Sequence, residues 1–277
     1  MTDTVEIEKN TETQAQEKFE KKMGNEALWQ QVFGIGAPEL KKMQKWNKKL
    51  PSDPRCKLCN APFKGIGGWL MRFKGKARNN RNPNFCNACD SFIEAHPGGA
   101  EIDLSMLFVD IRGSTDYAEH ANPLDVSQRI NAFLDAATNI IIDNDGFVAA
   151  FYGDCIVATW PPGFCGEEHA KKCLNTAIEV ARHSIKDHEG KVIPVGVGAH
   201  TGSMYISVVS AAKGSFRDVS VFGANVNLTA RLASSAQASE ALVSEDIINA
   251  AKQTFAADKK KELTLKGFSQ SVTAYSA

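Results

Sequence analysis

The sequence predicts an α+β protein in which a small cysteine-containing module precedes a larger C-terminal domain. Strand-like and helix-like segments alternate from residue 101 onward, several strands are joined by hairpin signals, and two C-x2-C pairs lie between residues 55 and 90. Strands that mix with helices and also form hairpins indicate a sandwich with a mostly antiparallel sheet. A chain of 277 residues is long enough for such a domain plus an accessory piece.

The N-terminal third divides into three predicted segments. Residues 1–18 are polar and lack apolar periodicity, which predicts a disordered tail. Residues 19–54 carry apolar side chains at helical spacing and form a predicted helical segment, interrupted near the glycines at 34 and 36. Residues 55–96 form a cysteine-rich, basic module, and a Pro-Gly-Gly linker then leads into the domain at 101–277.

The C-terminal domain begins with a buried strand, expected at residues 104–111. Helical spacing follows over residues 116–143, with a break at Asn122-Pro123, and a Gly-Asp turn between two apolar runs predicts a hairpin. The same criteria place helices at 167–187, 225–234 and 242–252, and strands at 147–152, 155–160, 192–200, 203–209, 218–222, 263–265 and 272–275.

Charge and hydropathy exclude several classes of protein. The formal net charge is zero, so no overall charge favours nucleic acid. No apolar stretch approaches the ~20 residues of a membrane-spanning helix, and the N-terminus lacks the apolar core of a signal peptide, so we expect a cytoplasmic protein without a membrane partner. Residues 41–81 are strongly basic, opposed only by Asp53. We interpret them as a solvated or domain-docking face, with nucleic-acid binding as the alternative.

Two carboxylates stand where strands are predicted to end. Asp110 ends the apolar strand in the motif LFVDIRGST, and Asp154 lies in the hairpin turn of FYGDC. Together they could hold two divalent ions ~3.5–4 Å apart on a triphosphate, and magnesium prefers such ligands; either one alone is more simply a helix cap or turn residue. The next helix begins with residues whose backbone N–H groups can bind phosphate oxygens, namely Gly113, Ser114 and Thr115.

A third motif, GANVNLTARL at residues 223–232, carries Asn227 and Arg231 on one helix face, because they are four residues apart. An amide and a guanidinium on one face can bind a ribose and growing phosphate charge. A solvated polar face is the alternative reading.

In this order and spacing, the three motifs resemble those of the class III nucleotidyl cyclases. The late segment LTLKGFSQSVTAY is similar to the ending of that family, so the resemblance covers residues 101 to 275. It implies a ferredoxin-like sandwich that forms a head-to-tail homodimer with active sites at the interface. It also implies that Asp110, Asp154 and the backbone carbonyl of Ile111 bind two Mg²⁺ or Mn²⁺ ions, while Asn227 and Arg231 of the partner subunit stabilise the transition state.

The reaction implied by this resemblance converts a nucleoside triphosphate to its 3′,5′-cyclic monophosphate and pyrophosphate for signalling. Ala150 stands where adenylate cyclases usually carry a lysine that contacts adenine, and Ser220 stands where they carry aspartate or threonine. ATP is the default substrate, and CTP or UTP is the alternative. A catalytically weak, regulatory nucleotide-binding protein is a further alternative, although such relatives tend to lose one of the four polar residues that are all present here.

The cysteine pairs predict a metal site. Four thiolates in two C-x2-C turns make a closed tetrahedral zinc site, which we expect from Cys56, Cys59, Cys86 and Cys89. An iron–sulfur cluster uses the same ligands, and a redox dithiol is a third reading. The arrangement resembles the N-terminal part of stand-alone bacterial cyclases, and regulation of the cyclase is the working hypothesis for its role.

Overall fold

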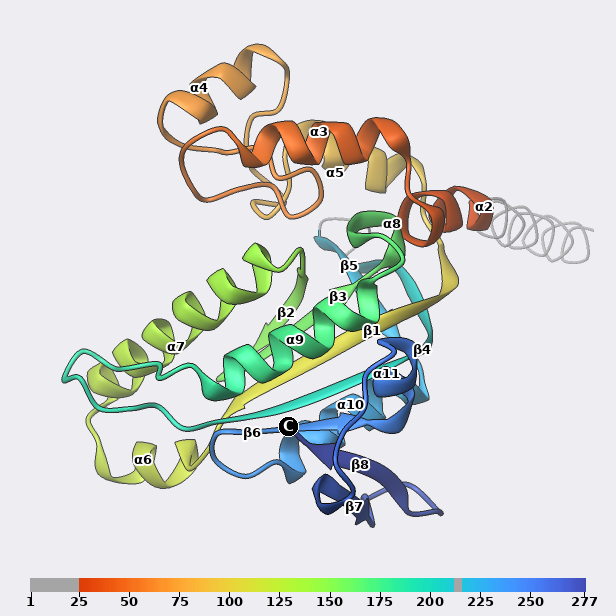
Figure 1. Ribbon diagram of the computed structural model, residues 1–277. Helices are drawn as coiled ribbons and strands as arrows, with labels where there is room; N and C mark the ends of the chain where they lie inside the picture. Colours follow the sequence, from red (N-terminus) through yellow and green to blue (C-terminus); the bar gives the residue numbers. More distant parts are fainter. Residues whose placement is uncertain (1–24, 212–215) are drawn as a thin grey trace, which may run out of the picture. The chain divides into compact units, whose positions relative to one another are not determined.

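The computed structural model describes residues 25–211 and 216–277 (Figure 1). The tail predicted at residues 1–18 lies outside this range. Contacts divide the chain into two compact units, which we call the N-terminal unit (Met1–Glu101 with Tyr205–Ser220) and the C-terminal unit (Ile102–Met204 with Val221–Ala277). The described residues 205–211 and 216–220 belong to the domain at 101–277 by sequence order, yet they group with the N-terminal unit.

An eight-stranded sheet runs through the structure in the order β2-β3-β1-β4-β6-β8-β7, and β5 pairs with β4. The pairs β1–β3, β2–β3, β6–β8 and β7–β8 are antiparallel, whereas β4–β6 is parallel. The predicted α+β class is therefore confirmed, with a mixed sheet. The strands are β1 (Gly99–Ile111), β2 (Phe147–Tyr152), β3 (Cys155–Trp160), β4 (Val195–Ala211), β5 (Phe216–Phe222), β6 (Glu240–Ser244), β7 (Lys260–Leu263) and β8 (Val272–Ser276).

Helices of the C-terminal unit cover both faces of this sheet. Along β6, Ala241 and Val243 join the large core cluster that also contains residues of α9, whereas Leu242 joins a second cluster with Leu228 and Leu232 of α10. Because neighbouring strand residues point to opposite faces, α9 and α10 lie on opposite sides of the sheet. The helices are α6 (Ser114–His120), α7 (Pro123–Asp143), α8 (Pro162–Cys165), α9 (His169–Arg182), α10 (Ala224–Ser235) and α11 (Glu245–Ala250).

The predicted break at Asn122-Pro123 separates α6 from α7. The Asn122 side chain accepts a hydrogen bond from the backbone N–H of Asp125 at 3.0 Å, and Pro123 occupies the first turn. An asparagine cap followed by proline is a favourable helix start, because it satisfies one free N–H and removes another.

Two of the sequence predictions are wrong. A helix is expected at 242–252, but the first part of this segment belongs to strand β6, whose five residues are all buried. Only Glu245–Ala250 is helical. The strands expected at 192–200 and 203–209 are one continuous strand, β4. In both cases pairing with neighbouring strands decides the conformation, which local propensity does not capture.

The N-terminal unit contains α2 (Glu26–Trp29), a π-helix η1 (Gln30–Ile35), α3 (Pro38–Lys48), α4 (Gly65–Phe73) and α5 (Asn87–Ala95). Buried amides of α3 hold the first cysteine turn: Gln44 Nε2 donates to the carbonyl of Leu58 at 2.8 Å, and Asn47 Nδ2 to that of Cys59 at 2.7 Å. The predicted helical segment therefore packs directly on the cysteine module. None of the helices within the described ranges is long and apolar enough to cross a membrane.

Candidate active site and cysteine cluster

Strand pairing brings the two predicted carboxylates together. The register of β1 and β3 sets Asp110 opposite Cys155, and Asp154 comes directly before Cys155 in the β2–β3 turn. Gly153 opens this turn with a φ of 63°, a left-handed conformation that favours glycine. Asp110 and Asp154 therefore meet at one end of this part of the sheet.

The two carboxyl groups are close enough for their charges to affect each other. Burial raises the pKa of Asp110, the Arg112 guanidinium at 2.6 Å opposes this rise, and the charge of Asp154 adds to it. Burial and the same two carboxylates raise the pKa of Cys155 to about 12, so this thiol stays neutral. A site that gathers negative charge in this way favours a cation.

The donor atoms fit a hard divalent metal. Asp154 Oδ2 is buried and has no hydrogen-bond partner among the residues described. A buried carboxylate oxygen without a partner is costly, and oxygen ligands of this kind are those that Mg²⁺ prefers. The residues present therefore fit a metal between Asp110 and Asp154.

A cavity of about 330 Å³ adjoins Asp154. Gly113, with a φ of 68°, caps α6 beside it. Four of the residues that the sequence assigns to metal or phosphate line the cavity: Ile111, Ser114, Thr115 and Asp154. The other lining residues are Tyr117, Ala118, Val126, Arg129, Ile130 and Gly153. The lining is mostly apolar, and Asp154 is its one carboxylate.

Asn227 and Arg231 are not part of this cluster. Both side chains are exposed on α10, and within the described residues no hydrogen bond or ion pair links either of them to Asp110 or Asp154. Ala150 is half-buried on β2 opposite Val157. Ser220 lies on β5 and belongs to the N-terminal unit.

The four predicted metal-binding cysteines converge in the N-terminal unit. The sulfur atoms of Cys56, Cys59, Cys86 and Cys89 all lie within 4.8 Å of one another, and all four residues are buried. Cys59 Sγ and Cys86 Sγ are 3.7 Å apart, close to the edge of about 3.8 Å expected for four sulfurs around an ion at about 2.3 Å. The backbone N–H of Cys86 points at Cys56 Sγ, 3.3 Å away. This geometry fits a tetrahedral metal.

Comparison with known proteins identifies the family. Residues 100–276 match the model of the adenylate and guanylate cyclase catalytic domain. The chain belongs to this cyclase family. Class III cyclases are lyases that make cyclic nucleotides and use divalent metals, in agreement with the carboxylate pair at Asp110 and Asp154.

Relatives of the cyclase domain occur in longer proteins. Over 134 residues the chain is 28% identical to an adenylate cyclase of Anabaena cylindrica, covering 47% of this chain and 26% of that protein. Over 171 residues it is 25% identical to the receptor-type guanylate cyclase gcy-8 of Caenorhabditis elegans, covering 59% of this chain and 15% of that protein. The chain thus spans only a minor part of these relatives.

Solved cyclase structures share the fold. The guanylyl cyclase Cya2 superposes with a TM-score of 0.59 at 22% identity, covering 65% of this chain and 93% of that one. The adenylyl cyclase CyaB from P. aeruginosa superposes with a TM-score of 0.55 at 25% identity, covering 63% and 92%. These matches confirm the cyclase-like α+β fold.

Two arginines near the carboxylate pair and the cavity are not among the residues that the sequence motifs predict. Arg112 pairs with Asp110 and donates from Nη1 to the carbonyl of Ser234 at 3.1 Å. It stands in the turn directly after β1, and a basic residue so close to the predicted metal-binding carboxylate in LFVDIRGST is the signal that could have revealed it. Arg129 lines the cavity, lies 4.5 Å from the centre of the Tyr117 ring and pairs with Asp187 at 2.6 Å. Nothing in the local sequence links Arg129 to Asp187, because the contact is tertiary.

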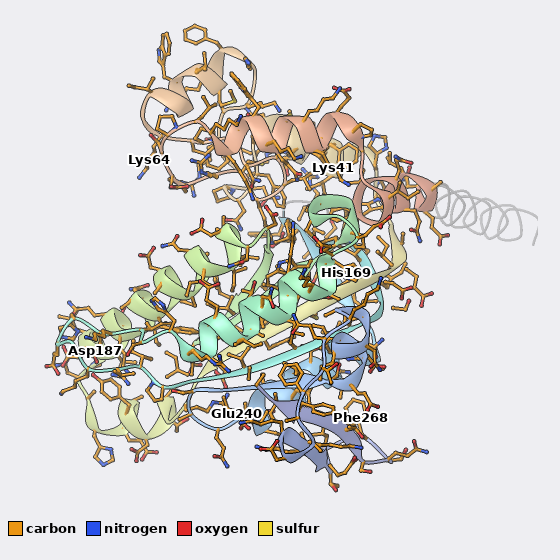
Figure 2. The ribbon with its side chains drawn as sticks, in the orientation of Figure 1. Lys41, Lys64, His169, Asp187, Glu240 and Phe268 are labelled. Carbon is orange, nitrogen blue, oxygen red and sulfur yellow. The ribbon has the colours of Figure 1, made fainter. Side chains whose placement is uncertain are left out.

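Asp187, the partner of Arg129, lies in the loop between α9 and β4 (Figure 2). Its carboxylate is 1% exposed and also accepts hydrogen bonds from the backbone N–H groups of Glu189 at 3.1 Å and Lys191 at 2.9 Å. Burial alone would raise the pKa of Asp187, but these two N–H groups and the Arg129 guanidinium hold it below the ordinary value. The charged form is therefore favoured in the folded protein.

Replacing Asp187 with asparagine should destabilise the protein at pH 7 by about 2 kcal/mol or more, since a buried guanidinium loses its anion. Because the folded pKa is the lower one, the stabilisation is complete above the unfolded value of about 3.9 and is lost as the pH falls through the folded pKa. Urea unfolding at successively lower pH should show the unfolding free energies of the wild-type protein and Asp187→Asn converging. Glu168→Gln, which breaks an exposed pair with Lys171, should change stability by less than about 1 kcal/mol at any pH. If the difference in unfolding free energy between wild type and Asp187→Asn were the same at every pH, the charge of Asp187 would not be the stabilising feature.

Proposed function

We propose that the protein is a nucleotidyl cyclase that converts a nucleoside triphosphate, ATP by default, to its 3′,5′-cyclic monophosphate and pyrophosphate. The observation that carries the proposal is the meeting of Asp110 with Asp154, whose Oδ2 is buried without a partner beside a cavity of about 330 Å³. Asp110, Asp154 and the backbone carbonyl of Ile111 are the groups that would hold two Mg²⁺ or Mn²⁺ ions. Such ions, when bound, lower the pKa of the attacking hydroxyl and neutralise the phosphates.

The remaining chemistry assigns roles to the protein's own side chains. The ribose 3′-hydroxyl loses its proton to solvent, and its oxygen attacks the α-phosphorus in line. The new P–O bond closes the ring while the bond from the α-phosphorus to the bridging oxygen breaks, and pyrophosphate leaves. Arg231 donates to phosphate oxygens whose negative charge grows in the transition state, which accelerates the chemical step rather than binding alone. Asn227, on the same helix face, orients the ribose. Gly113, Ser114 and Thr115 offer N–H and hydroxyl donors to the triphosphate.

A second copy of the chain would complete this site. Asn227 and Arg231 are exposed, and among the residues that the structure describes no hydrogen bond or ion pair joins either of them to Asp110 or Asp154 of the same chain. Large aromatic side chains next to both halves of the site are also exposed: Phe151 is 50%, Tyr152 63% and Phe222 44% accessible. Exposed apolar groups beside exposed functional ones are typical of a protein–protein interface. We therefore propose a homodimer in which each active site uses carboxylates of one subunit and α10 of the other.

The residues at positions 150 and 220 bear on which nucleobase the enzyme selects. Ala150 cannot offer the hydrogen bonds of a lysine, while Ser220 keeps a hydroxyl that can donate and accept. Loss of one polar partner relaxes selectivity by about 1–3 kcal/mol. ATP is therefore the proposed substrate. CTP or UTP is the alternative, because Ala150 and Ser220 depart from the residues that specify adenine.

Incubating the purified protein with Mg²⁺ or Mn²⁺ and each of the four ribonucleoside triphosphates tests this function. We expect mass spectrometry to find a cyclic monophosphate and pyrophosphate, most rapidly from ATP, and no product without the metal. A pyrimidine cyclic monophosphate as the main product would replace the ATP assignment. No cyclic product from any nucleotide, with retained nucleotide binding, would favour the regulatory nucleotide-binding protein instead.

The cysteine cluster adds a second proposed metal. We infer one structural Zn²⁺ held by Cys56, Cys59, Cys86 and Cys89, because their sulfur atoms approach the spacing of a tetrahedral site. An iron–sulfur cluster has the same ligand set and is distinguished by its visible absorption.

A further inference from the structure

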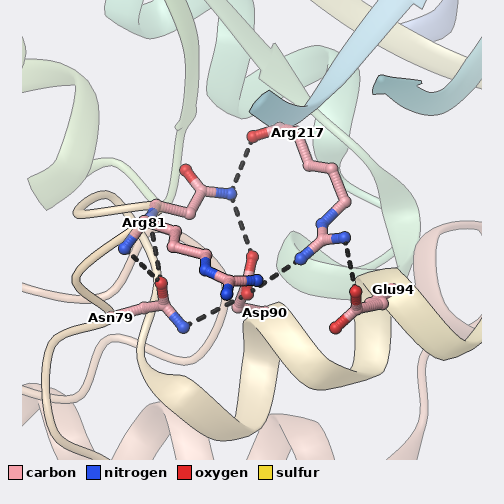
Figure 3. A network of polar contacts seen from close by, with 6 residues as sticks. Asn79, Arg81, Asp90, Glu94 and Arg217 are labelled. Atoms are coloured by element: carbon pink, nitrogen blue, oxygen red, sulfur yellow. Dashed lines mark hydrogen bonds and ion pairs between the residues drawn. The ribbon is translucent and has the colours of Figure 1, made fainter. Parts of the chain in front are cut away.

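Strand β5 is attached to the cysteine module by an arginine fork. Arg217 Nη1 lies 2.8 Å from Glu94 Oε1, and its Nη2 lies 3.3 Å from Asp90 Oδ2, both on α5 (Figure 3). The Arg217 side chain is 10% and that of Asp90 6% exposed. All of these residues belong to the N-terminal unit. The pair between Arg217 and Asp90 is buried, whereas Glu94 is 58% exposed. A buried, charge-assisted pair is costly to break, because removal of one partner leaves the other charge buried and uncompensated.

Two asparagines complete the network around Asp90. Asn79 Nδ2 donates to Asp90 Oδ2 at 3.2 Å, and Asn82 Nδ2 donates to Asp90 Oδ1 at 3.1 Å. Asn82 Nδ2 also donates to the backbone carbonyl of Arg217 at 2.7 Å. Figure 3 shows the side chains of Asn79 and Arg217 directed toward Asp90. The module thus binds both the side chain and the main chain of β5.

A second attachment holds the next residue of the strand. Lys57 Nζ donates to Asp218 Oδ1 at 2.8 Å, and the Lys57 side chain is 13% exposed. Neighbouring residues of a strand point to opposite sides, so Arg217 and Asp218 are held from different directions. The two attachments fix this part of β5 both in position and in rotation.

The partners of these attachments are next to the cysteines. Lys57 directly follows Cys56 in the first C-x2-C pair, and Asp90 directly follows Cys89 in the second. Each cysteine pair therefore carries one attachment to β5. A metal held by Cys56, Cys59, Cys86 and Cys89 would join the two pairs, and would so set the distance between the two groups that hold the strand.

We propose that the metal-bound cysteine module positions β5, and through it Ser220, so that Arg217 is a positioning residue for nucleotide selection. Ser220 follows Asp218 by two residues and is the last residue of the same compact unit. The strand ends at Phe222, and the chain then passes through Gly223 into α10, the helix that bears Asn227 and Arg231. The consequence for selectivity rests on the proposed cyclase function, whereas the attachment itself does not.

Hydrogen exchange of the full-length protein tests the attachment without reference to activity. The variants are Arg217→Gln, Asp90→Asn and Arg217→Lys, and the matched control is Lys42→Gln, which breaks an exposed pair with Glu39 in the same unit. Arg217→Gln and Asp90→Asn should speed exchange of the β5 amides about tenfold or more, because each leaves a buried charge without its partner. Arg217→Lys should show a smaller increase, since lysine keeps the charge but not the fork. Lys42→Gln should leave β5 unchanged.

Removal of the metal tests the link to the cysteines. A chelator selective for zinc, used with Mg²⁺ in excess, should speed exchange in residues 55–96 and in β5 together, while the β2–β3 hairpin of the C-terminal unit stays protected. In the metal-free protein, Arg217→Gln should increase the exchange of the β5 amides little further, because metal removal and the substitution break the same connection. Protein that purifies without zinc is compared before and after zinc is added, and the expected changes reverse.

Kinetics then test the consequence. Arg217→Gln and metal removal should each reduce the preference for the best nucleotide over the others about threefold or more, mainly through KM, because Ser220 would contact the base without taking part in the chemical step. Lys42→Gln should leave the preference unchanged.

Several results would overturn the proposal. Faster exchange in residues 55–96 with unchanged β5 would show that the metal does not act on the strand. If Arg217→Gln left the exchange rates of the β5 amides unchanged, Arg217 would not attach the strand. If the β2–β3 hairpin lost protection together with β5, the variant would be destabilised as a whole and the local attachment would be refuted. Altered β5 exchange with an unchanged nucleotide preference would limit Arg217 to a structural role. A protein without cyclase activity would refute the proposed function but leave the exchange results valid.

Discussion

Replacing Asp110 with alanine should abolish cyclisation, lowering kcat/KM by about a thousandfold or more, because metal stabilisation of the transition state amounts to several kcal/mol. Asp110 is half of the carboxylate pair, and Asp154 alone cannot hold two ions. The comparison is made with Mg²⁺ and Mn²⁺ and with the nucleotide that the wild-type protein prefers. Circular dichroism and the melting temperature show whether the variant is folded.

A neighbouring acidic residue provides the matched control. Asp116 is exposed in the first turn of α6, so Asp116→Ala should retain activity within a few-fold of wild type. A second readout separates metal binding from chemistry: Mn²⁺ with nucleotide should raise the melting temperature of wild type and of Asp116→Ala but not of Asp110→Ala, because only a bound ligand stabilises the folded state. Activity of Asp110→Ala within tenfold of wild type would refute the metal assignment.

Mixing two inactive variants should restore activity if the active sites are shared between subunits. Arg231→Ala should be inactive because the transition-state charge loses its donor, and Asp110→Ala because the metals are lost. In a mixed dimer one site carries both substitutions and the other carries neither. After free exchange of equal amounts, half of the dimers are mixed and each has one intact site, so about a quarter of the wild-type activity should return.

The same-half mixture is the control for this experiment. Asp110→Ala with Asp154→Ala should stay inactive, since both substitutions affect the carboxylate half and neither site in the mixed dimer is intact. Differently tagged subunits show by co-purification that mixed dimers form. Mixed dimers of Asp110→Ala and Arg231→Ala without activity would mean that each subunit builds its own site or that another interface is used.

Sequence patterns predicted much of the fold and the carboxylate pair, and the reasons are local. Apolar spacing marked α7 and α9, and the Asn122-Pro123 cap separated α6 from α7, because caps and periodicity depend on adjacent residues. Asp110 and Asp154 were recognisable because each lies at a strand end with a characteristic turn. The C-x2-C spacing predicted a cluster of thiols, and the four sulfur atoms do converge.

Only the tertiary structure decided the features that depend on distant partners. The segment Glu240–Ser244 is a strand because β4 and β8 pair with its two edges, and a short apolar run by itself does not distinguish a strand from a helix. Arg129 reaches Asp187 across 58 residues, and Arg217 reaches Asp90 across 127. The sequence by itself therefore determined the family, the motifs and most elements. Which charged groups become buried together was decided by folding, because burial and pairing are properties of the packed chain.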